Sequence, residues 1–210
     1  MSRENPSKGE QRKRALQRAQ DHSRFLREAA QAREDLVQTF LDAGALSAVS
    51  RALSATAESV ESRLRRQRSG LALAIALGDL AGELTLEQVT RSLSDFADHA
   101  LDEAVTAAIL ERVPDADPTG FAVIAMGKLG SHELNYSSDV DLLLLFDPES
   151  LPRRGRDDPG EAAVRIGRRL IELLQKRTED GYVQRVDLRL RPSPEVTPIV
   201  LPMNAARARA

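Results

Sequence analysis

The chain has 210 residues, of which 41% are hydrophobic, with 30 basic and 32 acidic residues and a formal net charge of −2. This composition is typical of one globular domain or two small ones, and the charge argues against a protein that binds nucleic acid over its whole surface. The absence of cysteine excludes disulfide bridges and thiolate zinc sites. No uncharged stretch approaches the roughly 20 apolar residues of a membrane helix, and the polar first residues do not resemble a signal peptide. We therefore expect a cytoplasmic protein that binds neither nucleic acid nor membranes.

The pattern of residues 1–113 predicts a helical region. The first forty or so residues are rich in Arg, Gln, Ala and Glu, which favour helices, and Gly44 is a typical helix terminator. The first twenty or so residues contain few apolar anchors, so we expect them to be frayed. From Thr85 onward, apolar residues recur at helical spacing, and Thr85 and Gln88 match a capping box. We expect this helix to end before Pro114 and to pack in a bundle.

The hydrophobic period changes after residues 114–118. Phe121–Met126 and residues 139–146 are short apolar runs, which predict two buried strands. Residues 161–178 return to helical spacing. Residues 182–191 alternate between apolar and charged side chains, which predicts a further strand.

Together these elements predict an α+β fold. An N-terminal helical segment is followed by a mixed β-sheet flanked by helices, over residues 119–200. Charge is unevenly divided, because residues 69–119 carry ten acidic and two basic residues, whereas residues 151–191 carry eleven basic and seven acidic ones. This asymmetry indicates a polyanion near the basic part.

Two aspartates mark the candidate site. Asp139 and Asp141 are two residues apart in an expected strand, so their carboxylates project from one face. In a Leu-rich strand this arrangement is costly unless a cation neutralises it, and oxygen ligands favour Mg²⁺ or Mn²⁺. Asp187, on the polar face of the last expected strand, would add a third carboxylate. The alternative is that Asp139 is a turn residue and Asp141 a solvated edge residue.

Glycines and arginines add candidate phosphate contacts. Gly130 and Ser131 lie between the first two expected strands, where free backbone N–H groups and a hydroxyl suit phosphate oxygens. Glycines at a strand end are most often turn residues, so this signal is weak alone. Arg185, Arg189 and Arg191 form a row that could clamp phosphates, or simply an ion-pair ladder.

These motifs resemble a known family. A Gly-Ser pair, an Asp-x-Asp pair and a later strand aspartate are similar to the signature of the DNA polymerase β type nucleotidyltransferase superfamily, here at residues 130–131, 139–141 and 187. Residues 127–142 and 185–192 together resemble the bifunctional glutamine synthetase adenylyltransferase/adenylyl-removing enzymes. The resemblance covers roughly residues 60–200.

The resemblance implies an activity and residue roles. Family members carry two nucleotidyltransferase copies: the N-terminal copy removes AMP from a tyrosine of glutamine synthetase by phosphorolysis, releasing ADP, and the C-terminal copy adds AMP from ATP. Residues 133–139 and the leading helical segment resemble the N-terminal, deadenylylating copy. By position, the catalytic and metal-binding residues would be Asp139, Asp141 and Asp187, with Mg²⁺ or Mn²⁺ as cofactor. The nucleotide and phosphate contacts would be Gly130, Ser131, Arg189 and Arg191.

The implied partners are glutamine synthetase, ATP, ADP, phosphate and a PII-type nitrogen-signalling protein. Family members are several times longer, so we expect a truncated version whose catalytic core is incomplete at its C-terminal end, with residues 201–210 as an atypical tail. The alternative hypothesis is a noncatalytic fragment that only binds glutamine synthetase or a nitrogen-signalling protein. Metal-dependent binding of ATP or ADP would favour the enzyme.

Overall fold

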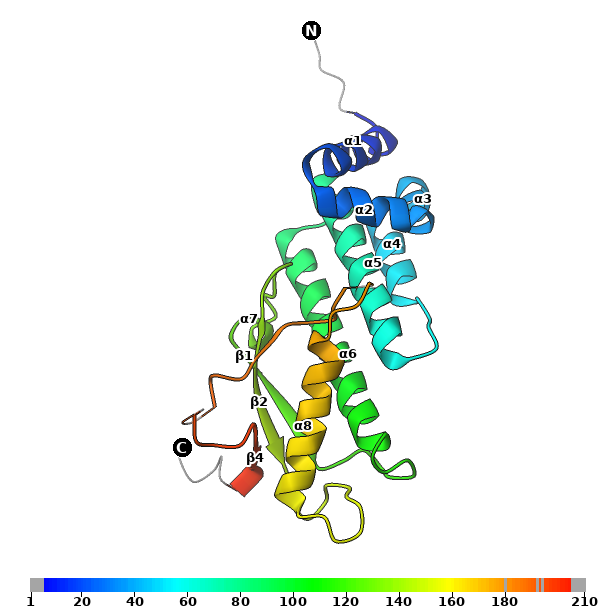
Figure 1. Ribbon diagram of the computed structural model, residues 1–210. Coiled ribbons are helices and arrows are strands. Elements are labelled where there is room, and N and C mark those ends of the chain that lie inside the picture. Colours follow the sequence, from blue (N-terminus) through cyan, green and yellow to red (C-terminus); the bar gives the residue numbers. More distant parts are fainter. Residues whose placement is uncertain (1–5, 180, 192, 194, 205–210) are drawn as a thin grey trace. The chain divides into compact units, whose positions relative to one another are not determined.

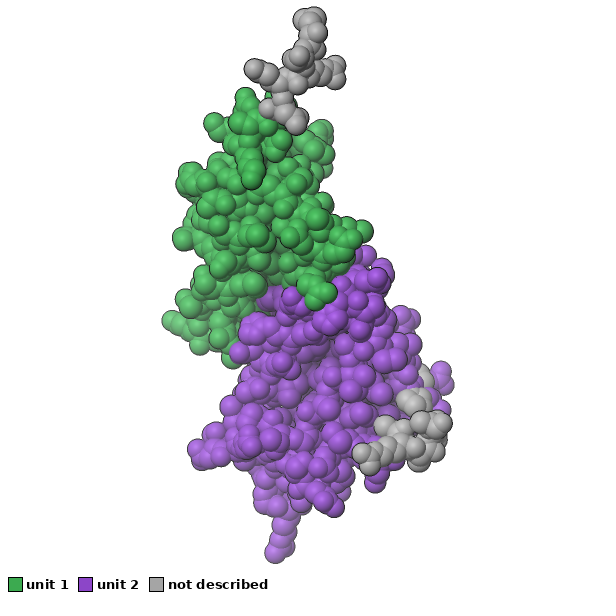
Figure 2. Space-filling view, turned by 180° about the vertical axis from the view of Figure 1, so that it is seen from behind, with its two compact units in different colours: residues 1–93 green, residues 94–210 purple. Residues whose placement is uncertain are grey.

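The predicted α+β class is confirmed by the computed structural model, which describes residues 6–179, 181–191, 193 and 195–204. Within these residues, eight helices and four strands are arranged with the first helices preceding a mixed sheet (Figure 1). The chain forms two compact units, Met1–Leu93 and Ser94–Ala210 (Figure 2). We expected the division near residues 114–118, but it falls within the long helix α6, Leu86–Leu110. Because the apolar stripe of α6 is continuous, no local sequence signal marks where its packing changes.

Helices make up the first unit: α1 Lys8–His22, α2 Arg24–Ala32, α3 Glu34–Ala43, α4 Ala45–Leu53, α5 Val60–Leu80 and the start of α6. A capping box begins α1, in which the Ser7 hydroxyl accepts the Glu10 N–H and the Glu10 carboxylate accepts the Ser7 N–H at 2.8 Å. Ala15 and Ala19 of this helix are buried. The expected fraying is therefore wrong from Lys8 onward, and residues 1–5 lie outside the described residues.

The predicted cap of α6 is present. The Gln88 side chain accepts the Thr85 N–H at 2.9 Å, and the Thr85 hydroxyl accepts the Gln88 N–H at 3.3 Å. As expected, the helix ends before Pro114. Among the described residues, no helix combines the length and the apolar character needed to cross a membrane.

One carboxylate connects two helices of the first unit. Glu83 forms an ion pair with Arg12 of α1 and also accepts the backbone N–H of Ala45, the first residue of α4, at 2.8 Å. Both charged side chains are less than one-fifth exposed. A carboxylate is stabilising at a helix N-terminus, where backbone N–H groups lack partners. Glu83 thus supplies the cap that Gly44, which has no side chain, cannot provide.

The contact between α4 and α5 requires a residue without a side chain. A Cβ atom on Gly78 would lie 2.6 Å from the Cβ of Ala45 and 2.7 Å from Cδ1 of Leu84. The Ala45 Cβ is fixed to the backbone, so it cannot rotate away. This glycine lets the two helices approach closely.

We expect Gly78→Ala to destabilise the first unit by about 1–3 kcal/mol, because the new methyl group overpacks the interface between the helices. Urea denaturation followed by circular dichroism measures the change in the free energy of unfolding. Gly9→Ala is the matched control, since Gly9 is also helical but has no atom within 4 Å of its would-be Cβ. An equal effect of the two substitutions would contradict the close-packing interpretation.

The central strand of the sheet is β2, Val140–Phe146. β1, Phe121–Met126, pairs with it antiparallel along one edge. On the other edge, β3, Val186–Asp187, pairs in parallel with the beginning of β2, and β4, Val200–Pro202, pairs in parallel with its end. Helix α8, Pro159–Gln175, packs against β3 and β4. The predicted apolar face of α8 is buried: Ala163, Ile166, Leu170, Leu173 and Leu174.

Two strand predictions need correction. β1 was expected to be buried, but Ile124 and Met126 are 42% and 43% exposed, because β1 lies at an edge of the sheet with one face open. The strand expected over residues 182–191 is reduced to β3. The chain turns after Asp187, whose carboxylate accepts the backbone N–H of Arg189 at 2.8 Å.

The C-terminal boundary also differs from the expectation. Leu201 and Pro202 pair with Leu145 and Phe146 in the sheet, so they belong to the folded unit and not to an atypical tail. Leu201 is only 8% exposed. Residues 205–210 of the expected tail lie outside the described residues.

Candidate functional site

The three predicted aspartates lie together at the beginning of β2 and β3. Asp141 and Asp187 are register partners in parallel strands, so their side chains share one face of the sheet. Asp139 comes two residues before Asp141 and projects to the same side. All three line one pocket of about 580 Å³. The other lining residues are Gly127, Lys128, Asn135, Ser137, Ser138, Arg185 and Arg189.

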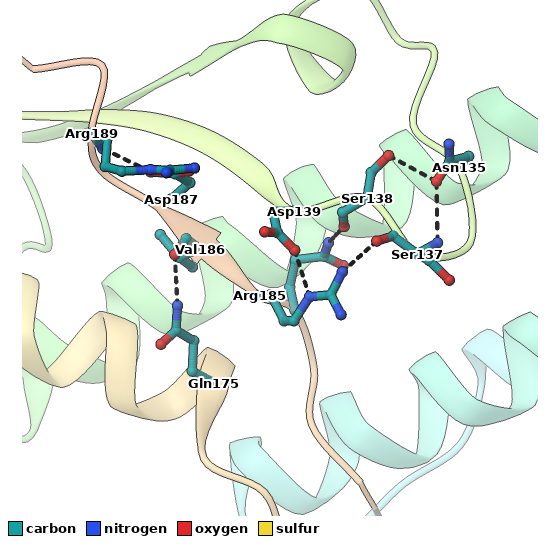
Figure 3. Close-up of polar contacts among 10 residues, drawn as sticks. Asn135, Ser137, Ser138, Asp139, Gln175, Arg185, Val186, Asp187 and Arg189 are labelled. Atoms are coloured by element: carbon teal, nitrogen blue, oxygen red, sulfur yellow. Dashed lines mark hydrogen bonds and ion pairs between the residues drawn. The ribbon is translucent and has the colours of Figure 1, made fainter.

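An arginine joins the segment before β2 to the segment before β3. Arg185 forms an ion pair with the carboxylate of Asp139 and donates a further hydrogen bond to the backbone oxygen of Ser137 (Figure 3). The pair raises the pKa of Arg185, chiefly through its hydrogen bond to Asp139. The Gln184 side chain, which is buried, donates to the Ser138 oxygen at 2.8 Å. These contacts hold Asp139 at the pocket although 46 residues separate it from Arg185 in the chain.

A second arginine forms an ion pair with the carboxylate of Asp187. Arg189 Nε lies 2.8 and 3.0 Å from the two carboxylate oxygens, and the Arg189 backbone N–H adds a third contact (Figure 3). The pKa of Asp187 is lowered, first by the side-chain hydrogen bond from Arg189 and then by its backbone N–H. The Asp187 side chain is 13% exposed, whereas that of Arg189 is 86% exposed. The Arg189 side chain therefore lies at the surface, and a ligand could reach it if the pair with Asp187 opened.

Polar side chains shape the segment that leads into Asp139. The Asn135 side-chain oxygen accepts the Ser137 N–H at 3.1 Å and the Ser138 hydroxyl at 2.8 Å (Figure 3). Just before it, the buried Leu134 donates its N–H to the Ser94 hydroxyl of α6 at 3.2 Å. An asparagine that bonds to the backbone two residues on stabilises a turn. The turn is thus anchored at both ends.

Gly127 lies directly against a catalytic candidate. It is the first residue of the short helix α7, Gly127–Gly130, which follows β1 without a break. Its φ of +56° favours glycine, and a Cβ atom there would lie 2.6 Å from Oδ2 of Asp141. Any side chain at this position would displace the Asp141 carboxylate. The backbone of residue 127 therefore forms one wall of the pocket.

Three predicted phosphate contacts do not line the pocket. Gly130 packs on β1, since a Cβ there would lie 2.7 Å from the Ala125 oxygen. The Ser131 hydroxyl donates to the Glu133 carboxylate at 3.1 Å, and Arg191 donates to the Leu188 oxygen at 2.7 Å. Their contact with phosphate stays a prediction.

The pocket also contains five residues of the 127–142 motif that were not predicted as site residues: Gly127, Lys128, Asn135, Ser137 and Ser138. A signal for the last three was present in the polar run directly before Asp139. The signal for Gly127 was its place at the end of the first apolar run, where the chain must turn back.

The donor set suits a hard divalent cation. Three carboxylates and the neighbouring amide and hydroxyl groups offer only oxygen ligands, as Mg²⁺ and Mn²⁺ prefer. Within the described part of the chain, no three Asp, Glu or His side chains lie close enough together to bind one metal ion. Arg185 and Arg189 occupy two of the three carboxylates, so a cation would have to replace these pairs. The donor atoms are thus of the type that such an ion prefers, and the role of these residues as its ligands stays a prediction.

A family model described as glutamate-ammonia ligase adenylyltransferase matches residues 13–208. The chain belongs to this family. Three relatives, each called a bifunctional glutamine synthetase adenylyltransferase/adenylyl-removing enzyme, illustrate the similarity. The protein of Xanthobacter autotrophicus is 48% identical over 154 residues, 68% of this chain, and that of Rhizobium meliloti is 43% identical over 158 residues, 70% of this chain. The protein of Mesorhizobium japonicum is 38% identical over 207 residues, 89% of this chain.

The chain spans only a small part of the length of these curated relatives. The matched region covers 16% of the Xanthobacter and Rhizobium proteins and 21% of the Mesorhizobium protein. The region matched by the family model contains all the residues that line the pocket. The whole relatives contain several times more sequence than this chain.

The Arg189→Gln substitution should raise the pKa of Asp187 toward its ordinary value, because it removes the guanidinium that stabilises the carboxylate. A lowered pKa adds stability above the unfolded-state value of about 4, and this contribution is lost as the pH falls through the folded-state pKa. The variant should therefore lose less stability on acidification below that value.

Carboxyl-carbon NMR titration of Asp187 measures the shift directly. Arg24→Gln is the control, because Arg24 pairs with Glu28 in α2 and neither residue lines this pocket. An unchanged Asp187 titration in Arg189→Gln would show that the pair does not persist in solution.

Proposed function

We propose that this chain carries a nucleotidyl-transfer centre that removes AMP from a tyrosine of glutamine synthetase by phosphorolysis and releases ADP. The observation that carries the proposal is the gathering of Asp139, Asp141 and Asp187 in one pocket of a chain from this family. Glutamate-ammonia ligase is the systematic name of glutamine synthetase, and the relatives' names give the same target. The removing direction is supported by the resemblance of residues 133–139 to the N-terminal copy.

The three aspartates would hold Mg²⁺, or Mn²⁺. Such a cation, when bound, would neutralise phosphate charge and stabilise the departing oxygen. The residues of the chain have their own tasks. Arg185 and Gln184 position the segment that carries Asp139, and Arg189, once separated from Asp187, would be available to phosphate oxygens.

The proposed reaction balances without a protein nucleophile. An oxygen of hydrogenphosphate forms a bond to the phosphorus of the adenylyl group, and the bond from that phosphorus to the tyrosine oxygen breaks. The proton of hydrogenphosphate ends on the tyrosine oxygen, and the products are ADP and unmodified tyrosine. No group is oxidised or reduced. The pocket therefore has to orient two anions and offset their repulsion.

Glutamine synthetase, ADP and phosphate are accordingly the proposed partners. Use of ATP and recognition by a PII-type nitrogen-signalling protein follow from the resemblance, and a cytoplasmic location follows from the absence of cysteine. All three are part of the same proposal. Each can be tested separately from the chemistry of the pocket.

The deciding assay incubates the chain with adenylylated glutamine synthetase, Mg²⁺ and radiolabelled inorganic phosphate. The expected result is labelled ADP whose formation requires both phosphate and the divalent cation. Association with glutamine synthetase without any ADP would instead support the noncatalytic binding fragment. Labelled product in the absence of the adenylyl group would contradict the reaction.

We expect Asp141→Asn to abolish Mg²⁺-dependent ADP binding while keeping or slightly raising the melting temperature without metal, since it relieves repulsion among the three carboxylates. Calorimetric titration and thermal unfolding measure the two effects. Asp115→Asn serves as the control, because Asp115 is exposed in the loop before β1. Unchanged Mg²⁺-dependent binding in the Asp141 variant would remove this residue from the site.

A further inference from the structure

Some charged side chains of the pocket form ion pairs with one another and others do not. Its lining holds three carboxylates and three cationic side chains. Arg185 is paired with Asp139, and Arg189 with Asp187. Within the described part of the chain, the Lys128 ammonium has neither an ion pair nor a hydrogen bond, and the Asp141 carboxylate has none either. Lys128 is therefore the lining cation that a ligand can recruit without first breaking an existing pair.

The backbone of Lys128 is held in a defined place. Its carbonyl oxygen accepts the Glu133 N–H at 2.8 Å, and the next residue, Leu129, is 2% exposed and anchors α7 in the core. On the other side, Gly127 abuts the carboxylate of Asp141. The exposed side chain of Lys128 thus starts from a fixed point beside Asp141.

Phosphorolysis requires such a group. The attacking phosphate is a second anion that must approach an anionic adenylyl group in a pocket lined by three carboxylates. A lysine ammonium is a compact point charge that binds phosphate oxygens in many orientations. Gly130 and Ser131, which the sequence predicts to contact nucleotide phosphate, do not line this pocket and make local packing and hydrogen-bond contacts in the structure.

We propose that Lys128 binds the attacking inorganic phosphate, which becomes the β-phosphate of ADP. This inference rests on the proposed phosphorolytic function and names the residue that binds inorganic phosphate, the second substrate of that reaction. Lys128 contacts the phosphate that is not part of AMP, so it distinguishes ADP from AMP. Because it lies outside the aspartate set, it contributes to phosphate binding and not to holding the cation.

The test compares ADP and AMP binding to the full chain in the presence of Mg²⁺ by calorimetric titration. Lys128→Met should weaken ADP binding by about ten- to a hundredfold, the usual range for loss of a charge-assisted hydrogen bond, and should change AMP binding less than about twofold. Lys128→Arg should retain most of the ADP affinity, because it keeps the charge. Lys13→Met is the matched control, an exposed lysine of α1 in the first unit, and should bind ADP as the unaltered chain does.

Kinetics supply a second readout. In the phosphorolysis assay, Lys128→Met should raise the KM for inorganic phosphate by a similar factor and leave the KM for adenylylated glutamine synthetase unchanged. Equal loss of AMP and ADP affinity, or an unchanged KM for phosphate, would overturn the assignment of Lys128 alone. Failure of the unaltered chain to bind either nucleotide would overturn the proposed function together with this inference. The melting temperature should not change, because the Lys128 side chain makes no contact that the fold needs.

Discussion

The pocket depends on a parallel pairing only two residues long. Val140 and Asp141 of β2 lie beside Val186 and Asp187 of β3, and this register alone places two carboxylates from distant segments on one face. A shift of one residue would turn Asp187 to the opposite face of the sheet. So short a ladder cannot hold its register alone, and side chains around it supply the rest. Gln175 at the end of α8 donates to the Val186 oxygen at 2.7 Å (Figure 3). Arg185 and Gln184 hold the segment before β2 through their contacts with Asp139 and the Ser138 oxygen.

Electrostatic balance explains why arginines alternate with aspartates in this region. Three carboxylates on one sheet face repel one another, and a buried unpaired charge is costly. Arg185 and Arg189 each neutralise one of them. Both pairs are largely exposed on the arginine side, so solvent screens them and they contribute little to stability. Pairs of this kind can keep the carboxylates in place and still yield them to a divalent cation, which a deeply buried ion pair could not do without a large cost.

The exposed face of β1 lies on the same side of the sheet as the carboxylates. Met126 is the register partner of Asp141, and both Met126 and Ile124 are exposed on the face that carries the carboxylates. The opposite face is closed, with Val140, Leu142, Leu144 and Phe146 of β2 all buried. One face of the sheet therefore provides stability, while the other presents the charged pocket beside apolar side chains.

Local patterns in the sequence determined much of this protein. The capping box at Thr85 and Gln88, the apolar face of α8 and the two apolar runs that became β1 and β2 depend on neighbouring residues, so their spacing was sufficient. The Asp-x-Asp spacing likewise implied a shared face, because side-chain direction alternates along a strand.

Tertiary structure alone decided the rest. The turn after Asp187, the engagement of Ser131 with Glu133 and the place of Gly127 against Asp141 depend on contacts between segments, as does the membership of Leu201 in the sheet. The hydrophobic periodicity of the sequence does not predict such contacts, because they form only when separate elements pack together.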